Sequence, residues 1–128
     1  MSAMSDYLEN KVLDHILATT SYTAPATVYV GLSTGSFGDD NSGTELAGSG
    51  YGRVAASFGA ASSGTASNDA AIEFSAATGS WGTVSHFGLF DASTSGNLLI
   101  HGALTSSKVI ETGDILKVAI GDMDISAD

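Results

Sequence analysis

The sequence predicts a mainly β protein, an antiparallel β-sandwich or jelly roll with one N-terminal helix. From residue 27 onward, short apolar segments alternate with clusters of Gly, Ser, Asn and Asp, which are turn residues that break strands. Helical periodicity appears only before residue 19. The 128 residues suit a single domain over the whole chain, and the lack of cysteine excludes disulfides and thiolate metal sites.

The helix is expected at residues 6–18. Asp6 and Glu9 have the spacing of a capping box, and both acids favour the positive end of the helix dipole. We expect the apolar stripe of this helix to cover one face of the sheet or to reach a neighbouring protein. A lone His15 beside the stripe is expected to pack or cap. The stripe consists of Leu8, Val12, Leu13, Ile16 and Leu17.

Seven or eight short strands, separated by turns, are expected after the helix. Their predicted ranges are 27–33, 53–58, 71–74, 83–90, 98–105, 108–111, 115–120 and 123–126. No second helix is expected among them, which favours an antiparallel sandwich.

The segment 34–51 is expected to be a long loop without regular structure, and such loops tend to be functional or disordered. Its oxygen-bearing side chains could bind Ca²⁺, but their spacing does not fit the EF-hand pattern. A solvated or partner-contacting loop is therefore the simpler interpretation, and Phe37 within it indicates contact. The possible ligands are Asp39, Asp40, Asn41 and Glu45.

The most site-like feature is a predicted hairpin over residues 84–104 with a histidine on each strand. In the register that gives a clean apolar face, Phe87 opposes Ile100, and His86 then opposes His101 on the other face. Two histidines make half of a tetrahedral zinc site, and no nearby Cys, Asp or Glu completes it. We therefore expect no catalytic, cofactor or metal site.

The second face of this hairpin is also fairly apolar, so a neighbouring subunit is expected to cover it. This argument predicts an obligate homo-oligomer. Trp81 and Tyr51 are candidates either for a contact surface or for the core. The predicted subunit interface consists of Val84, His86, Phe90, Leu99, His101 and Ala103.

The net charge of −10 makes nucleic acid and membranes poor partners, because such a surface repels phosphate and anionic lipid. No apolar run approaches the roughly 20 residues of a membrane span. The N-terminus lacks the pattern of a secretory signal, so synthesis in a cytoplasm is expected. No Gly-x-Ser-x-Gly elbow stands between a strand and a helix, and no phosphate-binding loop occurs, so an enzyme is not expected.

Several segments resemble a family of small tailed-bacteriophage virion proteins, often named tail-fibre proteins, and some similar proteins are capsid cement (decoration) proteins. The resemblance covers nearly the whole chain and is most specific at residues 81–91 and 96–99. It implies a β-rich virion component without catalysis. The segments are DYLENKVLDHIL, TVYVGLSTG, GYGRVAASFGAAS and WGTVSHFGLFDASTSGNLLIHGALTSSKVIETGD.

The function expected from this resemblance is that of a structural capsid cement protein, with a trimer favoured. It would bridge major capsid protein subunits on the outer surface of the phage head and would stabilise the assembled shell by mass action. The candidate capsid contacts are Tyr7, Lys11, Phe37, Asp39, Asp40 and Glu45.

Three alternatives stay open. The first is a tail fibre or tail adaptor subunit, which copy number per particle would distinguish from a cement protein. The second is a Ca²⁺- or carbohydrate-binding module that uses Trp81, Tyr51 and the acidic loop. The third is a hydrolase that depends on His86 or His101.

Overall fold

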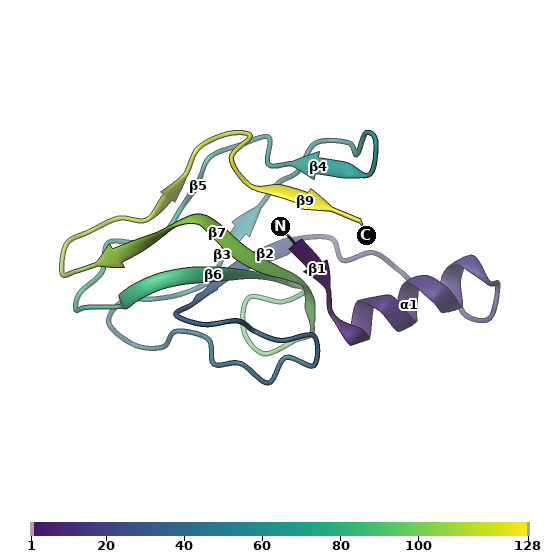
Figure 1. Ribbon diagram of the computed structural model, residues 1–128, viewed down its shortest axis with the longest axis horizontal. Coiled ribbons are helices and arrows are strands. Elements are labelled where there is room, and N and C mark those ends of the chain that lie inside the picture. Colours follow the sequence, from purple (N-terminus) through teal and green to yellow (C-terminus); the bar gives the residue numbers. More distant parts are fainter. Residues whose placement is uncertain (1, 128) are drawn as a thin grey trace.

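The computed structural model describes residues 2–127, which form antiparallel sheets packed as a sandwich and one helix that projects from it (Figure 1). The mainly β prediction with an N-terminal helix is confirmed. The elements are β1 (Ser2–Met4), α1 (Asp6–Ile16), β2 (Val28–Ser33), β3 (Val54–Ala56), β4 (Thr65–Ser67), β5 (Ile72–Glu73), β6 (Gly82–Phe90), β7 (Leu98–Ile110), β8 (Lys117–Val118) and β9 (Asp124–Ser126).

The main layer is a five-stranded antiparallel sheet with the order β1-β7-β6-β2-β3. The long hairpin of β6 and β7 lies at its centre, and the short strands β1 and β3 form its edges. Two small sheets, β4-β9 and β5-β8, complete the sandwich. Strand β1, which the sequence does not predict, pairs with part of β7 at the edge of the main sheet.

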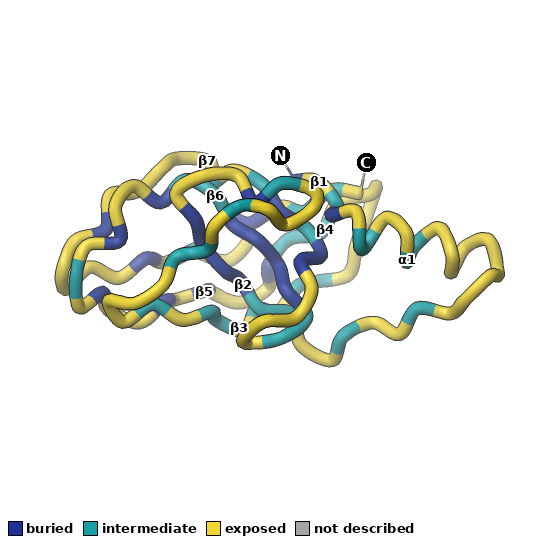
Figure 2. The backbone as a smooth tube through the Cα atoms, turned by 90° about the horizontal axis from the view of Figure 1, so that it is seen from below, coloured by how far each residue is buried: buried dark blue, intermediate teal, exposed yellow. Residues whose placement is uncertain are grey.

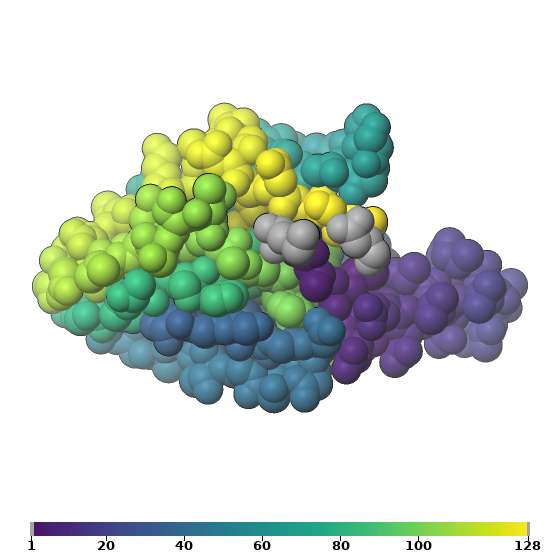
Figure 3. Space-filling view, in the orientation of Figure 1, coloured from purple at the N-terminus to yellow at the C-terminus, as the bar shows by residue number. Residues whose placement is uncertain are grey.

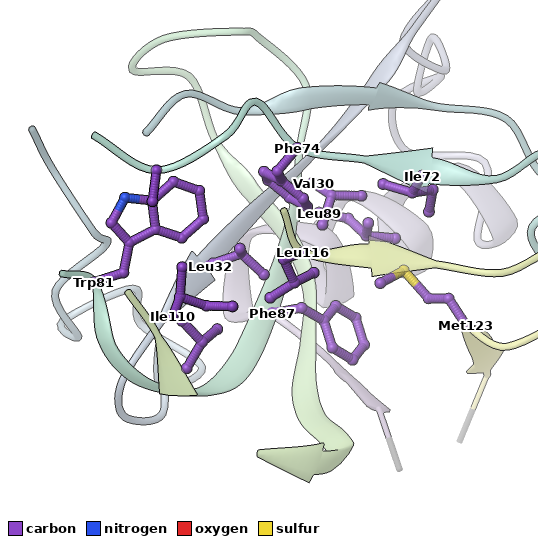
Figure 4. Close-up of a cluster of buried hydrophobic side chains, with 12 residues drawn as sticks. Val30, Leu32, Ile72, Phe74, Trp81, Phe87, Leu89, Ile110, Leu116 and Met123 are labelled. Atoms are coloured by element: carbon purple, nitrogen blue, oxygen red, sulfur yellow. The ribbon is translucent and has the colours of Figure 1, made fainter. Parts of the chain in front are cut away.

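The main core contains apolar side chains from the five-stranded sheet and from the segments around the small sheets (Figure 4). Three aromatic rings meet at one end of it: Tyr51 stacks on Phe74 at 6.3 Å between centroids, and Trp81 contacts Tyr51 edge-on at 5.6 Å. Alternation along the strands explains this burial, because every second residue faces the core. The buried members are Val30, Leu32, Ile72, Phe74, Ala77, Trp81, Val84, Phe87, Leu89, Ile110, Leu116 and Met123.

A second, smaller apolar cluster covers the opposite face of the five-stranded sheet. Phe37, from the loop 34–51, packs edge-on against Phe90 at 5.6 Å between ring centroids, and Leu98 completes the cluster. Gly88 makes room for it, because a Cβ atom there would lie 3.2 Å from Phe37 Cε2 and 3.0 Å from Phe90 Cε1. The loop 34–51 therefore covers part of this face of the sheet with Phe37.

Helix α1 begins at residue 6, as expected, but its N-cap lies one residue before the predicted cap. Ser5, not Asp6, is the N-cap: its hydroxyl accepts a hydrogen bond from Leu8 N and also donates one to the carbonyl of Leu98 in β7. The helix ends at Ile16, two residues short of the expected end at 18, and Ala18 follows with φ of 62°. Serine shares the cap preference of aspartate, so the sequence alone does not choose between them.

Helix α1 has no buried residue and extends away from the sandwich, as the exposed colouring in Figure 2 shows. The first of the two expectations for its stripe, that it covers a face of the sheet, is therefore wrong. No helix in residues 2–127 is long and apolar enough to cross a membrane.

The strands differ from the prediction mainly in number and length. The segments 98–105 and 108–111, expected as two strands, are one continuous strand, β7. Strand β4 was not expected, because its Thr-Ala-Ser sequence has no large apolar residue to mark a strand. Partner strands, not local sequence, decide these elements.

Candidate functional site

The hairpin of β6 and β7 exists, but its two histidines do not face each other. His101 pairs with Gly88, and His86 pairs with Ala103. The predicted register, with His86 opposite His101, is therefore wrong. The observed register therefore gives no support for a site formed by His86 and His101 together.

Leu89 pairs with Ile100 and not with Leu98, and this shift of two residues applies to both histidines, which lie in one regular stretch of β6 and β7 between two β-bulges. The first, between Val84 and His86, places Val84 and Phe87 together in the main core, although a regular strand would put them on opposite faces. The second lies between the pairs Leu89–Ile100 and Phe90–Leu98 and leaves Leu99 of β7 without a partner on β6, while Leu89 and Phe90 face opposite sides of the sheet as neighbours in a strand do. A bulge inserts an unpaired residue with little local signal, so register arithmetic on the sequence misses it.

The predicted subunit interface is largely internal to one copy of the chain. Val84, Phe90 and Leu99 are at most 5 % exposed, and His101 is 9 % exposed. His86 is half-buried and Ala103 is exposed. Since the loop 34–51 covers this face, the argument that a neighbouring subunit must cover it does not hold.

His101 joins the loop 34–51 to the strand β7. Its Nε2 lies 2.7 Å from Asp39 Oδ1, and the carbonyl of Asp39 accepts a hydrogen bond from Asp6 N at 2.9 Å. Ser5 N donates to the carbonyl of Leu99 in β7 at 2.8 Å. The base of α1, the loop and β7 thus meet at one point, which fixes the direction in which the helix leaves the sandwich.

A second polar cluster anchors the far end of the loop. Arg53 forms a bidentate ion pair with Glu45, with Nη2–Oε1 of 2.8 Å and Nε–Oε2 of 2.9 Å. The hydroxyl of Tyr51 donates to Glu45 and accepts from Leu32 N at 2.9 Å. Burial, together with the hydrogen bond to Glu45, raises the pKa of Tyr51 far above its usual range, so Tyr51 remains a donor.

Arg53 also holds the turn between β6 and β7. Its Nη1 donates to the carbonyls of Ala92 at 2.8 Å and Ser95 at 2.7 Å, and its guanidinium lies 3.6 Å above the Phe90 ring. One buried arginine therefore connects the loop 34–51 with the hairpin turn, and its planar, forked group suits such multiple contacts. Arg53 is not among the site residues that the sequence suggests.

The acidic residues of the loop do not converge on a cation. Among residues 2–127, no three His, Cys, Asp or Glu side chains are grouped closely enough to hold a metal ion. Asp39 pairs with His101, and Glu45 pairs with Arg53. Hydrogen bonds from Ser42, first from its side chain and then from its backbone, hold the pKa of Asp40 below its usual range. These contacts explain the acids without calcium.

Two of the six predicted capsid contacts are shielded within the chain itself, and a third, Asp39, pairs with His101 but stays exposed. Phe37 is 1 % exposed in the smaller apolar cluster, and Glu45 is bound by Arg53. A partner protein therefore meets neither side chain freely in this structure. The accessible members of the predicted set are Tyr7, Lys11, Asp39 and Asp40.

Trp81 belongs to the core and not to a contact surface. It is 5 % exposed, and its indole Nε1 donates to the carbonyl of Ser49 at 2.9 Å. A carbohydrate platform needs an aromatic face open to solvent, so this placement removes the main residue of the carbohydrate-binding alternative. Tyr51, its edge-on neighbour, is similarly engaged with Glu45.

One serine and histidine pair lies at the first bulge. Ser85 Oγ is 2.7 Å from His86 Nδ1. A serine hydrolase also needs an acid that orients the histidine, and among residues 2–127 no carboxylate accepts a hydrogen bond from His86. The pair is a local contact between chain neighbours.

The most exposed apolar surface lies on α1. Leu13 is 56 % exposed, Ile16 71 % and Leu17 69 %. The sequence analysis identifies this stripe, and the structure shows that the body of the same copy leaves it uncovered (Figure 2). A contiguous apolar patch of this kind is typical of an interaction site.

A hollow in the surface lies between β7 and the residues 116–124, and we call it the β7 hollow. It has a volume of about 470 Å³. Its apolar floor includes Phe87, Leu116 and Met123, all of which belong to the main core (Figure 4). Lys108 and Lys117 also line it. Of the site residues that the sequence suggests, Ala103 alone lines this hollow.

Comparison with known proteins gives one family. The family Gp80, described as podophage GP4 fiber I protein gp80, matches residues 3–126. No curated protein matches the chain. Because the match spans almost the whole chain, this protein belongs to the podophage GP4 fiber I protein family, a family of phage virion structural proteins.

Proposed function

We propose that the protein is a non-catalytic structural subunit of a phage tail fibre and that it works as a homo-oligomer. The observation that carries the proposal is the family match over residues 3–126, whose description names a fibre protein. A fibre subunit needs a body that keeps its shape and a surface that joins neighbours. The sandwich suits the first task, and the projecting helix suits the second.

The arrangement of charged side chains supports a mechanical role. The two closest ion pairs, Arg53–Glu45 and His101–Asp39, connect a long loop to the sheet and do not line a common cleft. They hold the loop 34–51 at two points, Asp39 and Glu45. Such ties suit a module that transmits force, because an untied loop of this length would open locally at little cost.

The position and number of copies in the virion test this proposal. We expect quantitative mass spectrometry of purified particles to give a copy number far below that of the major capsid protein. Gold-labelled antibodies against this protein should mark the tail in electron micrographs. A copy number comparable to that of the major capsid protein, with label over the head, would contradict the fibre assignment.

A capsid cement protein is the second candidate. Some proteins similar to the virion-protein family that the sequence resembles are decoration proteins, and the net charge of −10 suits a protein that remains on the outer shell, away from packaged DNA. In that role a trimer would bridge major capsid protein subunits and stabilise the expanded shell by binding only that state. The copy number measurement distinguishes the two candidates, and particles that lack the protein should lose head stability only in the cement case.

A further inference from the structure

We propose that the exposed face of α1 in one copy docks into the β7 hollow of a second copy. The inference deepens the proposed function and rests on it, because a fibre subunit must contact its neighbours. It names the two surfaces that meet and the chemistry by which they fit. Both surfaces are open in the single chain.

The exposed face of α1 combines apolar and acidic side chains. At about 100° per residue, Leu13 lies on the same side of the helix as Ile16 and Leu17, which follow it by one turn. Asp6 and Glu9 lie on that same side, closer to the sandwich, and both are exposed. This side of the helix therefore presents an apolar end and an acidic end.

The β7 hollow has the complementary character. Its floor consists of buried apolar side chains, Phe87, Leu116 and Met123, and the half-buried Leu104 borders it. Lys108 and Lys117 line it and are exposed. An apolar floor beside two ammonium groups matches an apolar helix end beside two carboxylates.

Charge complementarity favours a second copy as the occupant. The chain has 4 basic residues against 14 acids, so most surfaces of two copies repel each other. One of the four, Arg53, is bound to Glu45, and two of the remaining three line the hollow. Asp122 and Asp124 line it as well, although Asp124 accepts a hydrogen bond from Ser67. The hollow is thus the region where an acidic copy meets two lysines together.

The positions of the two surfaces give a head-to-tail contact. In Figure 1, α1 projects at one end of the longest axis, whereas the C-terminal end of β7 lies towards the other end, and the yellow strand β9 points back towards the α1 side. Figure 3 shows the same separation on the molecular surface. A contact between two different surfaces is heterologous, so it either closes into a ring, such as a trimer, or continues as a filament. Both outcomes suit a fibre.

Disulfide trapping tests the contact directly, because the natural chain has no cysteine. A chain with Leu17→Cys is mixed with a tagged chain that carries Leu104→Cys under mild oxidation. We expect a crosslinked heterodimer from this pair. The control replaces Leu104→Cys by Ala47→Cys, an exposed position in the loop 34–51, which is drawn in blue on the opposite side of Figure 3 from the yellow segment. Equal crosslinking of both pairs, or of neither, would overturn the proposal.

A charge exchange identifies the partner surfaces independently. Glu9→Lys and Lys117→Glu should each weaken self-association by roughly tenfold, measured by sedimentation at micromolar concentration. The chain with both changes should recover most of that loss, because opposite charges again meet across the contact. Two single effects that simply add in the double variant would contradict the proposed pairing.

Removal of the apolar end gives the largest effect. Replacing Leu13, Ile16 and Leu17 by serine should weaken self-association by roughly 100-fold or more. A natural chain that sediments as a monomer at micromolar concentration would overturn self-docking. If such a monomer still enters particles at the tail and the serine variant does not, α1 binds another virion protein: the docking inference then fails, while the proposed fibre role stands.

Discussion

The sandwich and the helix α1 differ in how far their apolar residues are buried. In the sandwich, the bulges, the small sheets and the loop 34–51 together cover both faces of the five-stranded sheet. In α1, no residue is buried, and three large apolar side chains are more than half exposed. The sandwich buries its core within one copy and leaves Val109, Ile115 and Ile120 exposed outside that core, whereas no residue of the helix is buried.

This contrast has an energetic consequence for the helix. Isolated helices shorter than about 12–15 residues are marginally stable in water. Helix α1 has 11 residues, and its described contacts with the body lie at its N-terminal end, around Ser5 and Asp6. We therefore expect it to depend on its cap and on a partner, and the following substitutions separate the two regions.

The largest difference should come from matched truncations in the two regions. Phe74→Ala removes a ring that is 2 % exposed between Tyr51 and Trp81, and it should lower the free energy of unfolding by about 3–5 kcal/mol. Ile16→Ala on α1 should change it by less than about 0.5 kcal/mol in dilute solution. Urea unfolding followed by circular dichroism measures both. A large loss from Ile16→Ala would mean that α1 packs on its own sandwich.

The second effect concerns the ion pair that anchors the loop. Arg53→Met should cost about 2–4 kcal/mol, because it leaves the Glu45 carboxylate without its counter-ion and with only the Tyr51 hydroxyl as donor, and leaves the carbonyls of Ala92 and Ser95 without the arginine. The double variant Arg53→Met with Glu45→Leu should be more stable than the single one, since no unpaired carboxylate remains. Urea unfolding of the three chains decides this, and equal losses in the single and double variants would contradict an ion pair that ties the loop.

The third effect concerns the junction of the two regions. Ser5→Ala removes both the cap of α1 and the hydroxyl that donates to Leu98, at a cost of about 1–2 kcal/mol. Hydrogen exchange should accelerate along α1 and remain slow in β6. The matched control is Ser21→Ala, at an exposed position after the helix. Uniform acceleration in both regions would show that α1 and the sandwich unfold together.

The smallest effect concerns the turn of the central hairpin and depends on pH. Burial raises the pKa of Asp91, but hydrogen bonds from the side chain and backbone of Asn97 outweigh it and leave that pKa below its usual value. A carboxyl whose folded-state pKa is depressed stabilises the fold above about pH 4, and this contribution is lost as the pH falls through the folded-state pKa.

Asp91→Asn should therefore cost no more than about 1 kcal/mol at neutral pH, because solvent screens this partly exposed carboxylate. The difference from the natural chain should disappear in acid. Unfolding midpoints measured at neutral and at acidic pH test the change, and a difference that persists unchanged at low pH would mean that the charge of Asp91 is irrelevant.

Local sequence patterns predict the sandwich class well, because alternation and turn residues act over short distances. They also predict the amphipathic helix and the lack of regular structure between β2 and β3. The register of the central hairpin is not predictable in this way. It includes two bulges, and a bulge leaves little signal in the local sequence.

The predicted site residues show the same division. His101 and Asp39 are each identifiable as candidates, but their pairing joins positions that are far apart in the sequence. Arg53 carries no local signal of its role, although it contacts the loop, the hairpin turn and Phe90. The β7 hollow forms where β7 meets the residues 116–124, so no single segment encodes it.

The sequence by itself determined the class of fold, the amphipathic stripe of α1 and the acidic surface, because periodicity and charge are properties of neighbouring residues. Only the tertiary structure decided which faces remain uncovered. The hairpin face that looks open in the sequence is closed by Phe37 from the loop 34–51, and the stripe that could have covered the sheet projects into solvent. Burial depends on what packs opposite a residue, and that is settled by contacts between distant parts of the chain.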